Sequence, residues 1–427
     1  SCTRQMLRHR PLRKPRLKIT TKSILTFPYI IKETDRFGGP FPFCASRGRS
    51  TSAVRCDKIQ LQQHPFFIIV GVIKMIYDVA VIGAGPAGAT FARLAAEEGR
   101  RILLIDGQNE RCKKPCGGLL APDAQKALAH FDLTLPKSVL VDPQIFSVRT
   151  IDICRGQARH YARHYLNIDR YAFDRWLVSL VPDTVEIFRG RCTDVQRENG
   201  VFRLTLNGGG RVCDIHAARI VGADGANSLV RKRFFPTDKV MHYVAIQQWF
   251  TGANGLAPFY SCLFDEKTSE SCSWSICKDD YFIFGGCFTP KDCRAAFEAQ
   301  KTRLRDALHF DFSGCVKTEA CLALRPRRPR DFQTGADGVY LIGEAAGFIS
   351  PSSFEGISSA IISGSLLAES FGNSTEDGEI ARLYHRKTFR LRCKLTLKIA
   401  KRWFMYTPLV REWIMRTGVG SIRLWHK

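Results

Sequence analysis

The sequence predicts an α/β fold that combines a parallel sheet, a second and antiparallel sheet, and C-terminal helices. Three observations lead to this prediction. Residues 76–106 read as a strand, a glycine turn, a helix and a second strand. Residues 219–231 and 339–343 contain further apolar strands that run into glycine turns. Residues 240–288 are aromatic and β-rich with mixed apolar and polar faces, which suits an antiparallel sheet covering a pocket.

A glycine turn directly follows the first strand. Gly83, Gly85 and Gly88 stand at G-x-G-x-x-G spacing after the apolar run 79–82. The first glycine permits the tight turn, the second lets the backbone approach a pyrophosphate, and the third lets the helix pack closely on the strand. We therefore predict a Rossmann-type dinucleotide-binding unit.

The elements after this turn complete the predicted dinucleotide site. The helix from Pro86 to Glu98 offers free N–H groups and its positive dipole end to phosphates. Asp106 ends the next strand 18 residues after Gly88, where a carboxylate can accept both ribose hydroxyls of an adenosine. A strand before, a helix after and an acid at this distance make the motif far more specific than the glycine spacing alone.

Length and charge limit the classes of protein that fit. The chain has 427 residues, 45% of them apolar, which is enough for two domains and additional segments. The formal charge of +24 lies at the two ends. Residues 1–74 carry 15 Lys and Arg against 3 Asp and Glu, and residues 381–427 carry 13 against 1. The body of the chain is neutral, so we expect no nucleic-acid partner.

The 16 cysteines indicate neither a metal site nor a disulfide framework. They are scattered, without a C-x-x-C pair or a His/Cys cluster at zinc spacing. We expect free thiols in a reducing cytoplasm and predict no metal.

Residues 1–74 show no sustained helical or strand period, and we expect a disordered basic extension. Their one apolar run, 65–73, is too short to span a bilayer and has no small-residue cleavage site behind it. Three explanations fit this extension: an organellar transit peptide, a native basic arm, or upstream sequence translated from a start codon assigned too early. We favour a start at Met75, which would make the extension non-native.

The elements that follow alternate between the two predicted sheets. A loop at 112–122 and a helix at 123–131 come first. Asp169 is placed as the N-cap of a helix that runs to Val181 and returns the chain to the core. Strands are expected at 144–153, 160–168, 185–189, on both sides of the turn Glu198-Asn199-Gly200, and at 210–215.

The remaining segments close the antiparallel domain and return to the glycine turns. A helix at 290–308 and a strand at 316–324 precede a Pro/Arg-rich linker. The helix that starts near Gly356 points its N-terminus back toward the turn at 339–343. One basic helix is then expected over 381–404, followed by a short helix around 410–415.

Three separated motifs occur in a characteristic order: GAGPAG with Asp106, GADGANS with Arg231, and GEAAG with the helix that follows it. This order resembles that of the FAD-dependent oxidoreductases of the para-hydroxybenzoate hydroxylase type. PCGGLLAP, SWSICK and the basic C-terminal helices resemble the geranylgeranyl reductase family within them. The resemblance covers the chain from about Met75 onward. It implies a para-hydroxybenzoate hydroxylase-like FAD fold with a Rossmann-type nucleotide domain, an antiparallel β substrate domain and C-terminal helices.

The resemblance also implies how the chain divides into domains. The FAD-binding domain would consist of 75–143, 169–238 and 330–375, the substrate domain of 144–168 and 239–329, and the basic C-terminal helices of 376–427.

The ADP half of FAD would lie on the glycine turn and Asp106. Arg170, in an R-x-x-F-D pattern, would face the cofactor, and Asp224 with Gly225 would lie near the pyrophosphate. All of these positions are implied by the resemblance.

The flavin half would lie near two later segments. Glu344, one methylene longer than the family's usual aspartate, would bind the ribityl chain. The helix N-terminus at Gly356 and Ile357 would stabilise the anionic reduced flavin beside its pyrimidine. The full implied cofactor set is Gly83, Ala84, Gly85, Pro86, Ala87, Gly88, Asp106, Gly117, Gly118, Arg170, Asp224, Gly225, Gly343, Glu344, Gly347, Gly356 and Ile357.

Two residues are candidates on the substrate side. The resemblance places Cys116 near the isoalloxazine as a candidate catalytic thiol, although a bare cysteine is more often an inert buried one. The family's Tyr-x-Trp-x-Phe-Pro pocket pattern keeps only its tryptophan here, as Trp274, a pocket wall or a core residue. This departure leaves the identity of the substrate open.

The implied activity is transfer of a hydride from flavin, reduced by NAD(P)H or another donor, to a C=C bond of an isoprenoid. A flavin monooxygenase and a membrane-associated electron-transfer or lipid-binding protein would share the cofactor motifs. The tryptophans among the basic residues of the C-terminal helices fit either a solvated face or a helix lying on anionic lipid. We expect a cytoplasmic protein, with peripheral contact to the inner face of the membrane in the second case.

Overall fold

The structure is a computed structural model that describes residues 76–109, 114–237, 240–251 and 260–425. The predictions for residues 1–74, including the start at Met75, lie outside these ranges, as does the first part of the loop 112–122.

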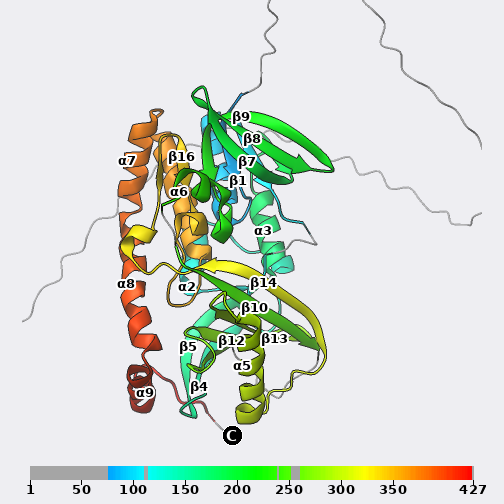
Figure 1. Cartoon of the computed structure of the whole chain (residues 1–427), viewed down its shortest axis with the longest axis vertical. Coiled ribbons are helices and arrows are strands. Elements are labelled where there is room, and N and C mark those ends of the chain that lie inside the picture. The colour runs from blue at the N-terminus through cyan, green and yellow to red at the C-terminus, as the bar shows by residue number, and fades with distance from the viewer. Residues whose placement is uncertain (1–75, 110–113, 238–239, 252–259, 426–427) are drawn as a thin grey trace, which may run out of the picture. The chain divides into compact units, whose positions relative to one another are not determined.

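The first sheet contains the predicted dinucleotide unit (Figure 1). Its central strands run parallel in the order β16-β9-β1-β2-β6. They are β1 (Ile76–Ile82), β2 (Ile102–Asp106), β6 (Glu186–Arg189), β9 (Arg211–Gly222) and β16 (Val339–Leu341), with β15 (Gly335–Ala336) antiparallel at one edge. β1 and β2 are buried because helices and further strands cover them, which explains their continuous apolar runs.

The hairpin predicted at residues 198–200 joins β7 (Arg191–Glu198) to β8 (Val201–Gly208). The segments predicted separately at 210–215 and from 219 onward form one strand, β9. Its first part pairs with β8, and its second part pairs with β1, where His216 lies opposite Ile76. The residues between the two predicted segments stay extended, because the pairing of β9 with β8 and its pairing with β1 overlap there.

Helices cover the first sheet. α1 (Pro86–Ala95) packs against α6 (Ile357–Gly372) and α3 (Arg170–Ser179), and α4 (Leu229–Phe234) contacts β7, β9 and β16. Asp169 is the N-cap of α3, as predicted, because its Oδ1 accepts a hydrogen bond of 2.8 Å from the amide of Ala172. The order of these segments brings the N-termini of α1 and α6 close to the glycine turns.

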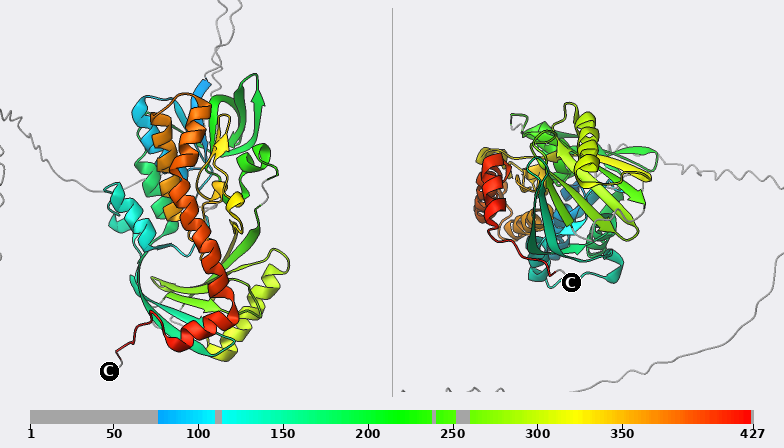
Figure 2. Two further views of the ribbon diagram at one scale, coloured as in Figure 1. Left: turned by 90° about the vertical axis from the view of Figure 1, so that its left-hand side faces the viewer. Right: turned by 90° about the horizontal axis from the view of Figure 1, so that it is seen from below.

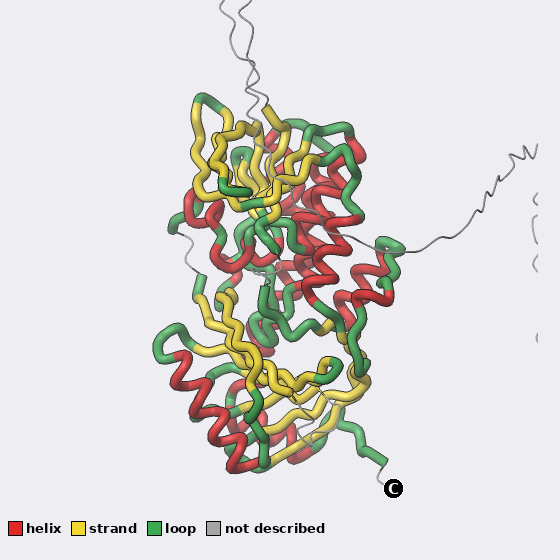
Figure 3. Tube along the Cα trace, turned by 90° about the vertical axis from the view of Figure 1, so that its right-hand side faces the viewer, coloured by secondary structure: helices red, strands yellow, loops and turns green. Residues whose placement is uncertain are grey.

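The second sheet, whose strands are drawn in yellow in the lower half of Figure 3, has the order β14-β10-β13-β12-β11-β4-β5-β3. Its strands are β3 (Leu119–Leu120), β4 (Ile145–Asp152), β5 (Gln157–Asn167), β10 (His242–Thr251), β11 (Tyr260–Phe264), β12 (Cys272–Lys278), β13 (Tyr281–Phe288) and β14 (Cys315–Leu324). The pairing is antiparallel as expected, except that β11 and β4 are parallel. α5 (Cys293–Leu308) covers one face, where the rings of Phe284 and Phe297 stack with centroids 5.4 Å apart.

The single helix expected over 381–404 is instead two helices, α7 (Asp377–Lys387) and α8 (Phe389–Tyr406). Thr388 separates them, since its hydroxyl bonds to the carbonyls of Tyr384 and His385 at the end of α7. α9 (Pro408–Thr417) follows, at the position of the short predicted helix. Figure 2 shows α8 running from α7 alongside the first sheet to α9 beside the second. Within the described ranges, no helix combines the length and apolar character that crossing a bilayer requires.

Candidate functional site

A cavity of about 900 Å³ lies between the two sheets. One end is lined by the glycine turn, including Gly83 and Gly85, and the other by Tyr260, Trp274 and Ile276 of the second sheet. Its volume falls in the range of pockets that enclose a cofactor or drug-sized ligand. Most of the predicted cofactor residues line it, namely Gly83, Ala84, Gly85, Pro86, Ala87, Gly117, Arg170, Asp224, Gly225, Glu344, Gly356 and Ile357, together with Cys116 and Trp274.

The three glycines of the first turn differ in their surroundings. Gly83 has a φ of +108°, and a Cβ there would lie 2.5 Å from the carbonyl oxygen of Ala223. A Cβ at Gly88 would lie 1.9 Å from the carbonyl oxygen of Gly83, so close packing requires glycine. A Cβ at Gly85 would meet no atom within 4 Å and would point into open space. These surroundings fit the separate reasons given for each glycine, and the contact of Gly85 with a pyrophosphate stays a prediction.

Five predicted cofactor residues lie behind the cavity wall rather than on it: Gly88, Asp106, Gly118, Gly343 and Gly347. Gly347, for example, has a φ of +81°, and its Cβ would lie 2.7 Å from the carbonyl oxygen of Asp331. The glycines among them shape the turns, and contact of these five residues with a cofactor stays a prediction.

Asp106 is buried and ion-paired. Its carboxylate binds Arg175 of α3, with 3.2 Å between Nη2 and Oδ1, and also Arg189 at the end of β6. The amide of Gln108 donates a further hydrogen bond of 3.1 Å to Oδ1. A ribose contact, which stays a prediction, would therefore have to share this carboxylate with two guanidinium groups.

The loop that carries Cys116 lies against the second sheet. A Cβ at Gly117 would come within 2.9 Å of Cδ1 of Ile276 and 3.8 Å of Nε1 of Trp274. The amide of Gly118 donates a hydrogen bond of 3.4 Å to the sulfur of Cys116, and Arg170 pairs with Asp174 through an Nε–Oδ1 contact of 2.9 Å. Although burial opposes it, the charge of Asp174 raises the pKa of Arg170. The structure thus brings Cys116, Gly117, Arg170 and Trp274 together.

Glu344 is held by two groups that local sequence spacing does not indicate. Nζ of Lys114 lies 2.7 Å from Oε2, and the amide of Leu324 donates to Oε1 at 3.0 Å. The Glu344 carboxylate raises the pKa of Lys114. Lys114 also reaches to within 3.9 Å of the Cβ position of Gly225, so it is a cavity cation that the sequence prediction missed. The two adjacent lysines in CKKPCGG are the sequence signal that could have indicated this cation.

Two polar features of the cavity lack hydrogen-bond partners in the described part of the chain. Oδ1 of Asp224 is buried without a hydrogen bond from any described residue, and burial raises the pKa of this carboxyl group. α6 begins at Ile357 with Gly356 as its N-cap and no side-chain cap, so the first amides of this helix point toward the cavity unpaired. A polar cofactor could satisfy these groups.

Comparison with known proteins identifies the family. A family model for an NAD(P)-binding Rossmann-like domain matches residues 81–112. Protein CbrA from Shigella flexneri and from Escherichia coli is 45% identical over 351 residues, which is 81% of this chain and 94% of each relative. The chain belongs to the CbrA family. The segments 115–125, 243–250, 280–286 and 341–350 also resemble the bacterial colicin M resistance flavoprotein of the geranylgeranyl reductase family, and the CbrA relatives confirm that resemblance.

Solved structures confirm the predicted fold of this CbrA-family chain. A geranylgeranyl bacteriochlorophyll reductase-like protein from Thermoplasma acidophilum matches with a TM-score of 0.65 and 19% identity, over 78% of this chain and 88% of that chain. PqsL from Pseudomonas aeruginosa, described as a probable FAD-dependent monooxygenase, matches with a TM-score of 0.60 and 17% identity, over 81% and 100%. The fold is therefore the one shared by FAD-dependent monooxygenases and reductases.

Proposed function

We propose that this CbrA-family protein is an FAD-dependent oxidoreductase that reduces C=C bonds of an isoprenoid or polyprenyl lipid. The observation that carries the proposal is the continuity of the cavity from the glycine turn to the aromatic wall of the second sheet. A cofactor at one end and an apolar substrate at the other would share one enclosed space.

The polar end of the cavity fits FAD. The open space at Gly85 leaves room for a pyrophosphate, and the uncapped N-terminus of α6 favours negative charge. Lys114 and Arg170 add two cations to this end. A bound flavin, reduced by NAD(P)H or another donor, would supply the hydride for one carbon of the double bond, while the other carbon takes a proton.

The opposite end suits an apolar chain. Leu119, Ile246, Trp274 and Ile276 line it and exclude water from any substrate beside the cofactor. Nε1 of Trp274 makes no hydrogen bond with the described residues, so the indole is held by packing alone. Cys116 lines the same cavity on the loop that lies against Ile276 and Trp274, and the amide of Gly118 donates a hydrogen bond of 3.4 Å to its sulfur. These contacts support Cys116 as the candidate catalytic residue.

Reduction of the bound flavin without oxygen, followed by addition of polyprenyl lipids, tests the reaction. We expect lipid products whose mass has increased by pairs of hydrogens. Insertion of oxygen after air is admitted would instead identify a monooxygenase, and a purified protein without flavin would contradict both. Cys116→Ser should slow reduction of the lipid while flavin remains bound, whereas Cys315→Ser, at an exposed cysteine of β14, should not.

We also propose that the α8–α9 region contacts an anionic membrane surface. Trp403, Leu409 and Trp413 are 61%, 75% and 63% exposed, and Phe404 is exposed beside them. The segment that carries this apolar group is basic, since residues 381–427 carry 13 Lys and Arg against 1 Asp or Glu. Exposed aromatic side chains next to cations support binding at a lipid headgroup layer.

A further inference from the structure

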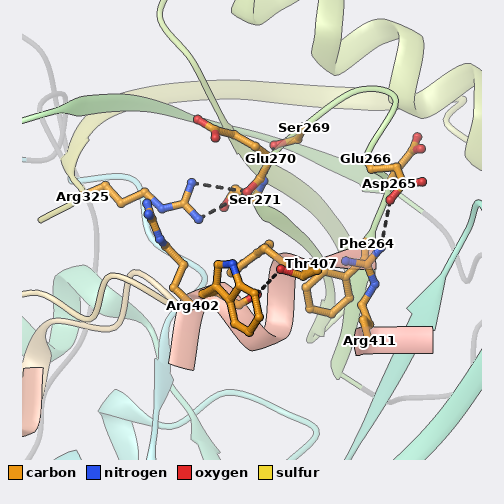
Figure 4. Close-up of a pocket in the computed structure, with 12 residues that line it drawn as sticks. Phe264, Asp265, Glu266, Ser269, Glu270, Ser271, Arg325, Arg402, Thr407 and Arg411 are labelled. Atoms are coloured by element: carbon orange, nitrogen blue, oxygen red, sulfur yellow. Dashed lines mark hydrogen bonds and ion pairs between the residues drawn. The ribbon is translucent and has the colours of Figure 1, made fainter. Parts of the chain in front are cut away.

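A second cavity, of about 270 Å³, lies where the turn between β11 and β12 meets α8 and α9 (Figure 4). None of its lining residues lines the larger cavity. Arg325, Arg402 and Arg411 reach it from three segments, and Glu270 and Ser271 line it from the turn that precedes β12. Neither the reaction proposed above nor the cofactor uses this cavity.

The carboxylates of this cavity are already ion-paired. Oδ2 of Asp265 lies 2.7 Å from Nε of Arg303. Glu266 pairs with Arg155 at 3.2 Å, and Glu270 pairs with Arg327 at 3.3 Å. The acidic side chains are thus neutralised by arginines other than Arg325 and Arg402.

Arg325 and Arg402 have no such counter-charge. Arg325 is 1% exposed, and its guanidinium donates only to carbonyl oxygens, those of Pro351 and Glu270, each at 3.3 Å. Neither arginine forms an ion pair within 4.0 Å with any residue that the structure describes. Burial and the charges of Arg325 and Arg327 lower the pKa of Arg402. Two adjacent cations without an ion pair of their own are costly in a partly buried site.

Two further donors in the cavity are unsatisfied. Oγ of Ser271 is buried and makes no hydrogen bond with the described residues. Nη2 of Arg411 likewise makes no hydrogen bond with the described residues, although it is ion-paired with Oε2 of Glu266 at 3.5 Å. Unpaired buried donors are rare in folded proteins and indicate a missing acceptor.

We propose that this cavity binds a phosphate group. A phosphate carries several acceptor oxygens and up to two negative charges, which match two guanidinium groups without an ion pair and a hydroxyl without a hydrogen bond among the described residues. The phosphate could belong to a lipid headgroup or to a free ion. Trp403, which lines the cavity and is exposed next to Phe404, places the opening beside the apolar surface of α8 and α9.

The test uses the full chain with its cofactor bound and three matched variants. Equilibrium dialysis measures binding of inorganic phosphate, and cosedimentation measures binding to phosphatidylcholine vesicles with and without phosphatidic acid. Arg402→Gln should weaken phosphate binding by roughly tenfold to a hundredfold, because a charged hydrogen-bond donor is lost. Ser271→Ala should weaken it by about threefold to tenfold. Arg390→Gln removes an exposed cation from the same helix, about three turns away, and should leave binding unchanged.

Each outcome is decisive. Selective loss in Arg402→Gln and Ser271→Ala with dissolved phosphate supports a site for the free ion. The same selective loss only with phosphatidic acid vesicles supports a lipid headgroup. Equal losses in Arg402→Gln and Arg390→Gln, or no binding by the wild-type protein to either probe, would overturn the proposal. Because neither measurement involves reduction of a C=C bond, failure here leaves the proposed reaction standing.

Discussion

Gly85 is the residue at which folding and cofactor binding can be separated. Its Cβ position is open, and its φ of −73° is one that alanine adopts without strain. Gly85→Ala should therefore change the free energy of unfolding of the cofactor-free protein by less than about 0.5 kcal/mol. The added methyl group would occupy the space of a pyrophosphate and should weaken FAD binding by roughly tenfold or more. Fluorescence titration with FAD measures this loss.

Gly88→Ala provides the contrast. Its Cβ would lie 1.9 Å from a backbone oxygen, so this variant should lose about 1–3 kcal/mol of folding stability. Unchanged FAD affinity in Gly85→Ala would mean that the cofactor does not approach this turn.

Lys278 gives the protein a specific dependence of stability on pH. Burial lowers its pKa to about 8 from 10.5, and its Nζ donates to the carbonyls of Gly118 and Ile168. Between these two pH values the unfolded chain binds more protons than the folded one, so this residue's contribution to the free energy of unfolding rises with pH. Relative to Lys278→Met, the wild-type protein should gain up to roughly 3 kcal/mol across this window.

Chemical denaturation at several pH values measures that difference. Below pH 8 the difference should be constant, because Lys278 is protonated in both states. Lys126→Met, at an exposed lysine of α2 (Pro122–His130), should differ from wild type by the same amount at every pH. If the difference in stability between Lys278→Met and the wild-type protein were also the same at every pH, the lowered pKa of Lys278 would be contradicted.

At the scale of elements, the N-cap of α3 controls the helix that carries Arg170 and Arg175. Asp169→Ala removes the hydrogen bond to the amide of Ala172 and should cost about 1 kcal/mol of folding stability. Asp169→Asn keeps an acceptor and should cost only a few tenths. Thermal unfolding of the two variants measures the difference, and equal losses would show that the charge of Asp169 matters more than the cap.

Elements with local signals could be predicted from the sequence, and elements set by distant pairing could not. The glycine turn after β1, the Asp169 cap and the hairpin at 198–200 each depend on a few neighbouring residues. The parallel pairing of β11 with β4 depends on segments more than 100 residues apart. The split at Thr388 was missed because the basic and apolar pattern continues across it, while a buried hydroxyl breaks the helix.

In the candidate site, too, residues that belong to local motifs could be predicted, and residues brought there by distant packing could not. The turn motifs identified the glycine-turn part of the cavity lining, because backbone geometry requires glycine at fixed spacing. Arg175 and Arg189, which bind Asp106 from 69 and 83 residues away, could not be predicted, because only the packing of α3 and β6 brings them there.

At the scale of the whole molecule, the α8–α9 surface should confer binding to anionic vesicles. The double variant Trp403→Ala/Trp413→Ala should bind phosphatidylglycerol vesicles at least about tenfold more weakly, because two apolar side chains no longer enter the headgroup layer. Added salt should weaken the wild-type protein further by screening its cations. Cosedimentation measures both effects. Val212→Ala, an exposed apolar position on β9, should bind like wild type, and an equal loss there would exclude a specific surface.

α8 joins the two halves of the molecule. Leu391 and Leu395 pack into the core of the first sheet and its helices. The hydroxyl of Tyr406, at the other end of the helix, donates to the carbonyl of Ser352 at 2.8 Å and accepts from the amide of Cys272 of β12 at 3.3 Å. A hinge rotation of the second sheet away from the first would have to break these contacts. Ligand exchange should then take place without rotation of the second sheet away from the first, so a ligand has to enter and leave a cavity whose two sides stay fixed relative to each other.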